Sequence, residues 1–139
     1  MPGDVSRVVE PSLRLVDSIT ELKPTYAGCI AVSGSHGGIS AARYALAVRP
    51  LLTVFNDAGV GRDEAGIAGL ALLQQEGLAA CAVSHDSACI GQAISTWEHG
   101  VVSHTNGCAL AIGVRQGMST RQAAIVIGAT HQPASFQKR

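Results

Sequence analysis

The chain has 139 residues, of which 47% are hydrophobic and 14% are charged, and its ten basic residues balance its ten acidic ones. This length fits one domain with a single core, and the even charge offers no basic surface to nucleic acid or anionic lipid. One Trp, two Tyr and two Phe are also too few for a base-stacking platform. No stretch reaches the ~18 apolar residues of a membrane span, so we expect neither a nucleic-acid-binding nor a membrane protein.

The first half of the chain predicts three strands and one long helix. Residues 1–11 are expected to be a solvated lead-in, and the apolar run LRLV at 13–16 predicts the first strand. SITEL at 18–22 is enough for about one helical turn before a Lys-Pro pair. GCIAV at 28–32 predicts the second strand, followed by a polar loop at 33–38 and a helix at 39–48. Pro50 ends this helix, and LLTVF at 51–55 predicts the third strand.

The second half predicts two more strands and four helices. Asp63 is the expected N-cap of a helix through AGIAGLALLQQE, which Gly77 closes. The fourth strand is expected at 79–83, a weaker helix at 88–98 and a brief fifth strand opening at 100–102. Two helices follow, in 107–117 and 119–128, of which the second has a capping box of Ser119 and Gln122 and ends at Gly128. The tail, 130–139, is expected to be loose.

Strands and helices alternate over short connections, and the strands are continuous apolar runs. This pattern is typical of a parallel sheet buried on both faces. It predicts one α/β domain over 1–139, with a three-layer, doubly wound (Rossmann- or flavodoxin-like), mostly parallel sheet of about five strands.

Polar residues follow the apolar runs directly. Because the carboxyl ends of parallel strands lie along one edge of a sheet, we expect them to share one pocket. Two glycine-rich loops also precede helix N-termini, where backbone N–H groups favour a carboxylate or phosphate. The expected ligand-binding residues are Ser33, Gly34, Gly37, Gly38, Asn56, Gly59, Gly61, Ser84, His85, Ser87, Ser103 and Asn106.

The same edge offers groups for acid–base or nucleophilic catalysis. We expect His36 to act as general base or acid, Asp57 to orient it or the substrate, and Ser35 or Ser33 to be a nucleophile or an oxyanion donor. His104 would complete the site. The order Ser-Gly-Ser-His-Gly does not match the GxSxG nucleophile elbow, and the sequence leaves open which of the three strand-end histidines is chemical.

These residues predict a small-molecule enzyme, a hydrolase of an amide or ester bond in a small polar or carboxylate-bearing metabolite. The alternative is a non-catalytic module or regulatory subunit that binds a small anion through the same loops. The cofactor stays unknown: His36, Asp57, His85 and His104 could hold zinc, manganese or iron if they converge, but no spaced ligand pair such as HExxH is present.

The cysteines and the low charge bear on location and assembly. Cys29, Cys81, Cys89 and Cys108 lack CxxC spacing, and in a chain with no export signal they predict reduced thiols in a cytoplasmic protein. Cys29 and Cys81 lie in apolar runs and are expected to be buried and inert. A small domain with so few charges cannot cover its whole surface with them, which predicts a homo-oligomer.

Overall fold

The computed structural model describes residues 11–130, so almost all of the expected lead-in and tail lies outside the described residues. These residues form a five-stranded sheet in the order β1-β2-β3-β4-β5. The first four strands are parallel and the fifth is antiparallel to β4. Their bounds are β1 (Leu13–Val16), β2 (Ile30–His36), β3 (Leu52–Asn56), β4 (Ala79–Val83) and β5 (Val102–Thr105).

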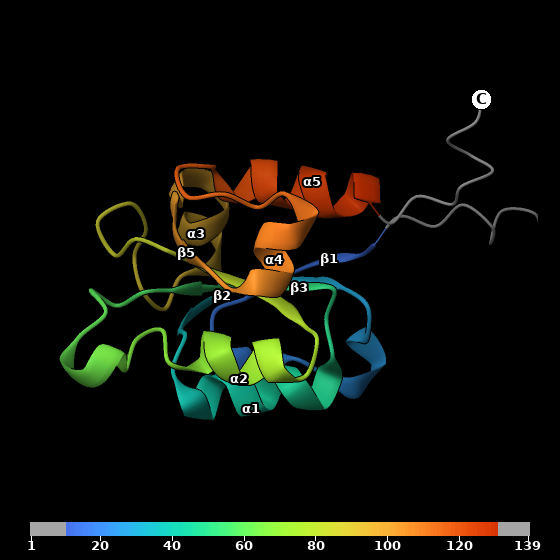
Figure 1. The fold of residues 1–139 in the computed structure, drawn as a ribbon, viewed down its shortest axis with the longest axis horizontal. Helices are drawn as coiled ribbons and strands as arrows, with labels where there is room; N and C mark the ends of the chain where they lie inside the picture. The colour runs from blue at the N-terminus through green and yellow to red at the C-terminus, as the bar shows by residue number, and fades with distance from the viewer. Residues whose placement is uncertain (1–10, 131–139) are drawn as a thin grey trace, which may run out of the picture.

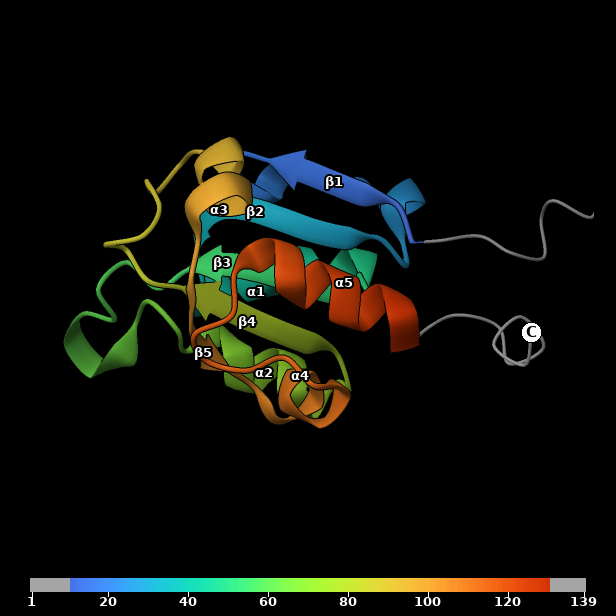
Figure 2. The same ribbon diagram turned by 90° about the horizontal axis from the view of Figure 1, so that it is seen from above.

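Helices cover both faces of the sheet (Figure 1), so the predicted three-layer, mostly parallel α/β fold is confirmed. One layer holds α1 (Ile39–Val48) and α2 (Gly69–Gln75), and the other holds α3 (Ala93–His99), α4 (Gly107–Ile112) and α5 (Thr120–Thr130). Three short 3-10 helices lie in connections: η2 (Ile19–Glu21), η3 (Pro24–Tyr26) and η4 (Arg62–Glu64). The order of the strands in the sheet is the same as their order in the chain (Figure 2). The layer of α3, α4 and α5 is therefore formed by the helices that follow β4 in the chain, and the order of the strands does not reverse at any point in the sheet.

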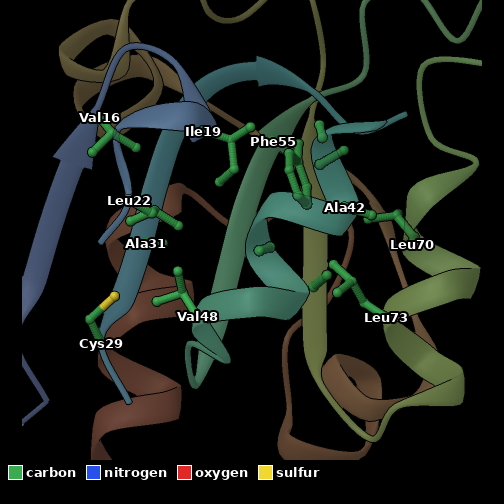
Figure 3. Packing of buried hydrophobic residues seen from close by; sticks show 14 residues of the cluster. Val16, Ile19, Leu22, Cys29, Ala31, Ala42, Val48, Phe55, Leu70 and Leu73 are labelled. Carbon is green, nitrogen blue, oxygen red and sulfur yellow. The ribbon is translucent and has the colours of Figure 1, made fainter. Parts of the chain in front are cut away.

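Side chains of each central strand alternate between two cores. Phe55 packs with Leu70 and Leu73 in the layer of α1 and α2 (Figure 3), whereas its neighbour Val54 packs with Ile127 beneath α5. Burying a side chain of this size stabilises the fold by about 1.5–3 kcal/mol. Because both faces of the sheet are buried, its strands are continuous apolar runs. No helix within the described range is long and apolar enough to cross a lipid bilayer.

The predicted capping box of α5 is confirmed, but the predicted end of this helix is wrong. The Ser119 N–H donates to Gln122 Oε1 over 2.9 Å, and the Gln122 N–H donates to Ser119 Oγ over 3.1 Å. The helix then continues through Gly128 to Thr130. Glycine ends a helix by adopting a left-handed conformation, and Gly128 is not among the positive-φ residues of the chain.

Other boundaries also differ from the prediction. The helix expected at 88–98 begins only at Ala93, the helix expected in 107–117 ends at Ile112, and the fifth strand runs from Val102 to Thr105. Strand β2 continues through His36, with a bulge against β3 after Val32, so the residues from Ser33 to His36 belong to the strand and not to a loop.

Asp63 is not an N-cap: it has φ 55° and helix α2 begins only at Gly69. Backbone N–H groups before and at the start of α2 bond outside the helix: Gly66 donates to the Val60 carbonyl and Gly69 to the Gly37 carbonyl, each over 2.8 Å. Gly66 also packs so closely on the Asp57 carbonyl that a Cβ there would collide with the oxygen.

Candidate functional site

The carboxyl ends of β3 and β4 and the beginning of β5 meet at one edge of the sheet. Asn56 ends β3 and Asp57 follows it, while Ser84 and His85 follow β4. Because β5 is antiparallel and pairs Val102 with Val83, it begins at this edge, which brings Ser103 and His104 there. The sequence prediction that Asp57, His85, Ser103 and His104 converge agrees with this placement, although it assumed that the fifth strand ends there.

Asp57 lies at the centre of this edge, with a side chain that is only 6% exposed. Its Oδ1 accepts hydrogen bonds from the backbone N–H groups of Gly59 (2.8 Å) and His85 (3.0 Å), and its Oδ2 accepts from Ser103 Oγ (2.7 Å). Burial by itself would raise the pKa of Asp57. The three donors and the nearby His104 outweigh burial, so the pKa lies below its usual value of 3.8 and the group is a carboxylate at neutral pH.

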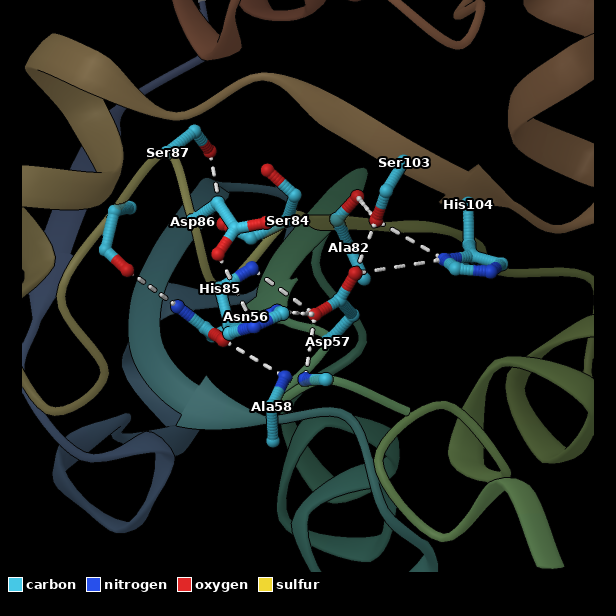
Figure 4. Close-up of polar contacts among 12 residues, drawn as sticks. Asn56, Asp57, Ala58, Ala82, Ser84, His85, Asp86, Ser87, Ser103 and His104 are labelled. Atoms are coloured by element: carbon cyan, nitrogen blue, oxygen red, sulfur yellow. Dashed lines mark hydrogen bonds and ion pairs between the residues drawn. The ribbon is translucent and has the colours of Figure 1, made fainter. Parts of the chain in front are cut away.

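Ser103 connects this carboxylate to His104 (Figure 4). Its Oγ lies 3.0 Å from His104 Nδ1. An ionised carboxylate can only accept, so the single hydroxyl proton of Ser103 points to Asp57, over 2.7 Å, in preference to the Ala82 carbonyl at 3.3 Å. The Ser103 oxygen then accepts from an Nδ1–H of His104. Neutral His104 therefore carries its proton on Nδ1 and has a lone pair on Nε2.

His104 is positioned to exchange protons with a ligand. Its side chain is 34% exposed, and its Nδ1 lies 3.8 Å from Asp57 Oδ2, close enough to form an ion pair when the ring is protonated. Among the residues that the structure describes, no hydrogen bond or ion pair involves His104 Nε2. This nitrogen is free to accept a proton.

His85 lies on the opposite side of Asp57 (Figure 4). Its Nδ1 is 3.5 Å from Asp57 Oδ1 and its Nε2 is 3.2 Å from Asp86 Oδ1. The ring stacks beside Gly59, where a Cβ would lie 3.6 Å from it. Both nitrogens of His85 therefore face carboxylates, which suits a charged or orienting role better than that of a base with a free lone pair.

The loop after Asp57 has an unusual backbone. Four of its residues have positive φ values, between 52° and 68°: Ala58, Val60, Asp63 and Glu64. Residues other than glycine rarely adopt such values. Such residues are each destabilising by roughly 1–3 kcal/mol and cluster at functional sites. Asn56 supports the loop, because its Oδ1 accepts from the Ala58 N–H over 2.8 Å. The strain is localised next to the Asp57 carboxylate.

Two grooves open on either side of this loop. The His104 groove has a volume of about 380 Å³ and is lined by Glu64, Ile67, Leu70, Gln74, His104 and Thr105, among others. The His85 groove has a volume of about 510 Å³ and is lined by residues that include Ala58, His85, Asp86, Cys89, Ser95 and His99. The carboxylates of Glu64 and Asp86 were missed in the sequence, because nothing in their spacing separates them from ordinary loop residues.

His36 and Ser35 are engaged in local structure. His36 Nδ1 accepts from the Gly38 N–H over 3.0 Å, so neutral His36 carries its proton on Nε2 and its ring covers the start of α1. Ser35 Oγ accepts from the Ile19 N–H over 2.8 Å. Among the described residues, no hydrogen bond or ion pair joins either side chain to Asp57.

The predicted oxyanion and anion-binding residues of β2 and of the turn after it are buried in backbone packing. Ser33 is fully buried and donates to the Val54 carbonyl over 2.8 Å. A Cβ on Gly34 would collide with the backbone at Gln92, and the Gly37 N–H donates to the Gly66 carbonyl over 2.8 Å. Gly38, also buried, is the N-cap of α1. These glycines allow close packing of neighbouring loops.

Of the other predicted ligand-binding residues, some hold backbone segments together by hydrogen bonds and some lie in an exposed loop. Asn106 follows the far end of β5. Its side-chain oxygen accepts from the backbone N–H groups of Ala80 and Ala109, and its side-chain nitrogen donates to the backbone carbonyls of Leu70 and Leu78, so it holds α4 in place. Ser87 bridges the Ser84 carbonyl and the Val101 N–H. Gly59 and Gly61 have positive φ and shape the exposed loop after Asp57.

The sequence also predicts possible metal ligands and the burial of two cysteines. Within 11–130, no group of three His, Cys, Asp or Glu side chains has an arrangement that could hold a metal ion. Cys29 and Cys81 are buried, as predicted, and burial raises the pKa of both thiols, for Cys81 to about 12. Cys89 is exposed and Cys108 is half-buried, and all four cysteines are free.

Comparison of the chain with protein-family models, with curated proteins and with solved structures gives no match. Function is therefore inferred from the geometry of the site alone.

Proposed function

We propose that the chain is an enzyme that hydrolyses an amide or ester bond of a small polar metabolite, with His104 as the general base and acid. One observation carries this proposal: Asp57, Ser103 and His104 form a continuous hydrogen-bonded chain on the lining of a groove, and no hydrogen bond or ion pair within residues 11–130 involves His104 Nε2 at its end.

In the proposed reaction His104 Nε2 removes a proton from a water molecule as the water oxygen bonds to the substrate carbonyl carbon. The ring becomes an imidazolium, whose charge is stabilised by Asp57 at 3.8 Å and through Ser103. When the tetrahedral intermediate collapses, Nε2–H returns the proton to the leaving nitrogen or oxygen and the C–N or C–O bond breaks. The products are a carboxylic acid and an amine or alcohol, and His104 is again neutral.

Gln74 is the candidate donor to the developing oxyanion. It lines the His104 groove, and its Oε1 accepts from the Cys108 N–H over 2.7 Å. This bond fixes the orientation of the amide, so Nε2 is the atom left to donate. Donors directed at developing negative charge are among the largest contributions to hydrolysis.

The experiment compares two histidines on a panel of chromogenic substrates, the p-nitrophenyl esters of acetate and pentanoate and the p-nitroanilides of acetate, pentanoate, glutarate and 5-aminopentanoate. We expect His104→Ala to reduce kcat at least a hundred-fold, within the range of general acid–base catalysis. The matched control, His36→Ala, should keep turnover, because His36 is engaged at the start of α1. Loss of turnover in His36→Ala with full activity in His104→Ala would support the role expected for His36 from the sequence.

The same panel tests the non-catalytic alternative. Saturable binding of a panel compound by the wild-type chain, without hydrolysis of any member, would favour a small-ligand-binding module or regulatory subunit over an enzyme. It would contradict the catalytic role of His104.

We further propose that copies of the chain associate through β1, the edge strand of the described sheet. Leu13 and Leu15 are about 40% exposed on this edge strand, and Ile94 of α3 and Ile125 of α5 are 52% and 69% exposed. Edge strands that carry apolar side chains favour pairing. Light scattering should therefore give a mass above the 14.2 kDa of one chain, and a particle of 14.2 kDa would exclude association.

The four free cysteines support a reducing compartment such as the cytoplasm as the location of the protein.

A further inference from the structure

The charges at the strand-end edge bear on which metabolites can enter it. The segments that follow the four parallel strands here, 17–18, 37–38, 57–68 and 84–92, contain a single cation, Arg62. The same segments contain the carboxylates of Asp17, Asp57, Asp63, Glu64 and Asp86. No Lys or Arg lines the His104 groove or the His85 groove.

The His104 groove itself combines one carboxylate with an apolar lining. Glu64 lies on this lining, and Ile67, Leu70 and two alanines of the same stretch contribute apolar surface. Asp57, which donors hold in its ionised form, lies next to the groove behind His104. A carboxylate in this groove would face the Glu64 carboxylate, with Asp57 behind His104 and no Lys or Arg on the lining, whereas an ammonium group would meet a favourable potential.

We propose that the substrate of the His104 groove bears an amine cation and an apolar chain, and is not a carboxylate-bearing metabolite. The ammonium group lies at Glu64 and the chain lies along Ile67 and Leu70, which leaves the scissile carbonyl near His104 Nε2. This inference deepens the proposed function and rests on it for the reaction, but the charge preference can be measured without turnover.

The test is an NMR titration of the ¹⁵N-labelled chain at pH 7 and constant ionic strength, with butylammonium and with butyrate as matched probes. Butylammonium should shift the backbone resonances of residues 64–74 and 104–107 saturably, with a Kd at least ten-fold lower than that of butyrate. Glu64→Gln should raise the Kd for butylammonium three- to ten-fold. The control Glu76→Gln, on the same stretch but beside Arg49 and outside the groove, should leave it unchanged.

Equal or tighter binding of butyrate, no saturable shift with butylammonium, or an unchanged Kd in Glu64→Gln would each overturn the inference. The substrate panel separates it from the proposed function. Butylammonium binding in the groove without hydrolysis of any panel member would leave the charge preference standing and refute the enzyme. A different result would support the enzyme and refute the charge preference: hydrolysis of the glutarate anilide that depends on His104 and is at least as fast as hydrolysis of the 5-aminopentanoate anilide.

Discussion

The Ser103 hydroxyl donates to Asp57 Oδ2 over 2.7 Å, so that a serine lies between the buried carboxylate and the His104 ring. In a Ser-His-Asp triad the histidine lies between the other two, and the serine is the nucleophile. Here the serine proton is directed to the carboxylate. Ser103 is therefore a positioning residue, and the reactive atom at the end of the chain is a histidine nitrogen.

Ser103→Ala should lower turnover of whichever panel member the wild type hydrolyses by ten- to a hundred-fold, because His104 loses the acceptor that fixes its tautomer. The free energy of unfolding should fall by about 1–3 kcal/mol, the range for a hydrogen bond to a charged group. Ser40→Ala, on the exposed surface of α1, is the control and should change neither quantity by much. Wild-type turnover in Ser103→Ala would remove Ser103 from the account.

Asp57→Asn should destabilise the fold by about 1–3 kcal/mol at neutral pH, because three donors lose a charged acceptor. The effect depends on pH in a defined direction. Since the pKa of Asp57 is lowered by folding, its ionisation stabilises the native state above about 3.8, and this contribution is lost as the pH falls through the lower, folded-state pKa.

Urea unfolding of the wild type and of Asp57→Asn between pH 3 and pH 7 measures the difference in their free energy of unfolding. The difference in free energy should be largest above pH 5 and should shrink towards pH 3. A difference that grows as the pH falls would mean that folding raises the pKa of Asp57.

Much of the fold could be predicted from the sequence, because local signals and tertiary packing agree there. The apolar run at 79–83 and the capping box of Ser119 and Gln122 have the predicted bounds and bonds. The start of α2 could not be predicted, because the Gly69 N–H donates to the Gly37 carbonyl of a distant segment, and such a tertiary contact leaves no signal in the local helical pattern. The antiparallel direction of β5 has no local signal either.

The candidate site was predicted in part. Asp57 follows β3 at the expected edge, whereas His104 lies there because β5 is antiparallel and begins at this edge instead of ending there. Their sequence pattern does not distinguish a reactive side chain from a structural one. Ser33 and Ser35 are equally polar in the sequence, yet each is occupied by a backbone group that comes from another segment of the chain.

Ala58→Gly should stabilise the fold by about 1 kcal/mol, because Ala58 has φ 52° and glycine adopts this conformation without strain. Ala47→Gly is the matched control: Ala47 is exposed within helix α1, where the same substitution should destabilise by about 1 kcal/mol. Thermal or urea unfolding of the two variants measures both signs. A loss of stability in Ala58→Gly would show that the backbone there is not strained.

Gly66→Ala should destabilise by about 1–3 kcal/mol and reduce turnover, since its Cβ would collide with the Asp57 carbonyl and displace the loop. Gly128→Ala, where nothing lies within 4 Å of the added Cβ, should raise stability by about 0.5–1 kcal/mol as an alanine within helix α5. Urea unfolding checks both values. Equal effects of the two substitutions would contradict the packing of Gly66 against Asp57.

The proposed role of His104 depends on which of its ring nitrogens carries the proton. ¹⁵N NMR of the imidazole groups, at a pH where the rings are neutral, identifies that nitrogen without a substrate. The hydrogen bonds predict that His104 carries its proton on Nδ1 and that His36 carries its proton on Nε2. Ser103→Ala should abolish the preference of His104 alone. A neutral His104 protonated on Nε2 in the wild-type chain would contradict the account, because its lone pair would then face Ser103 and not the groove.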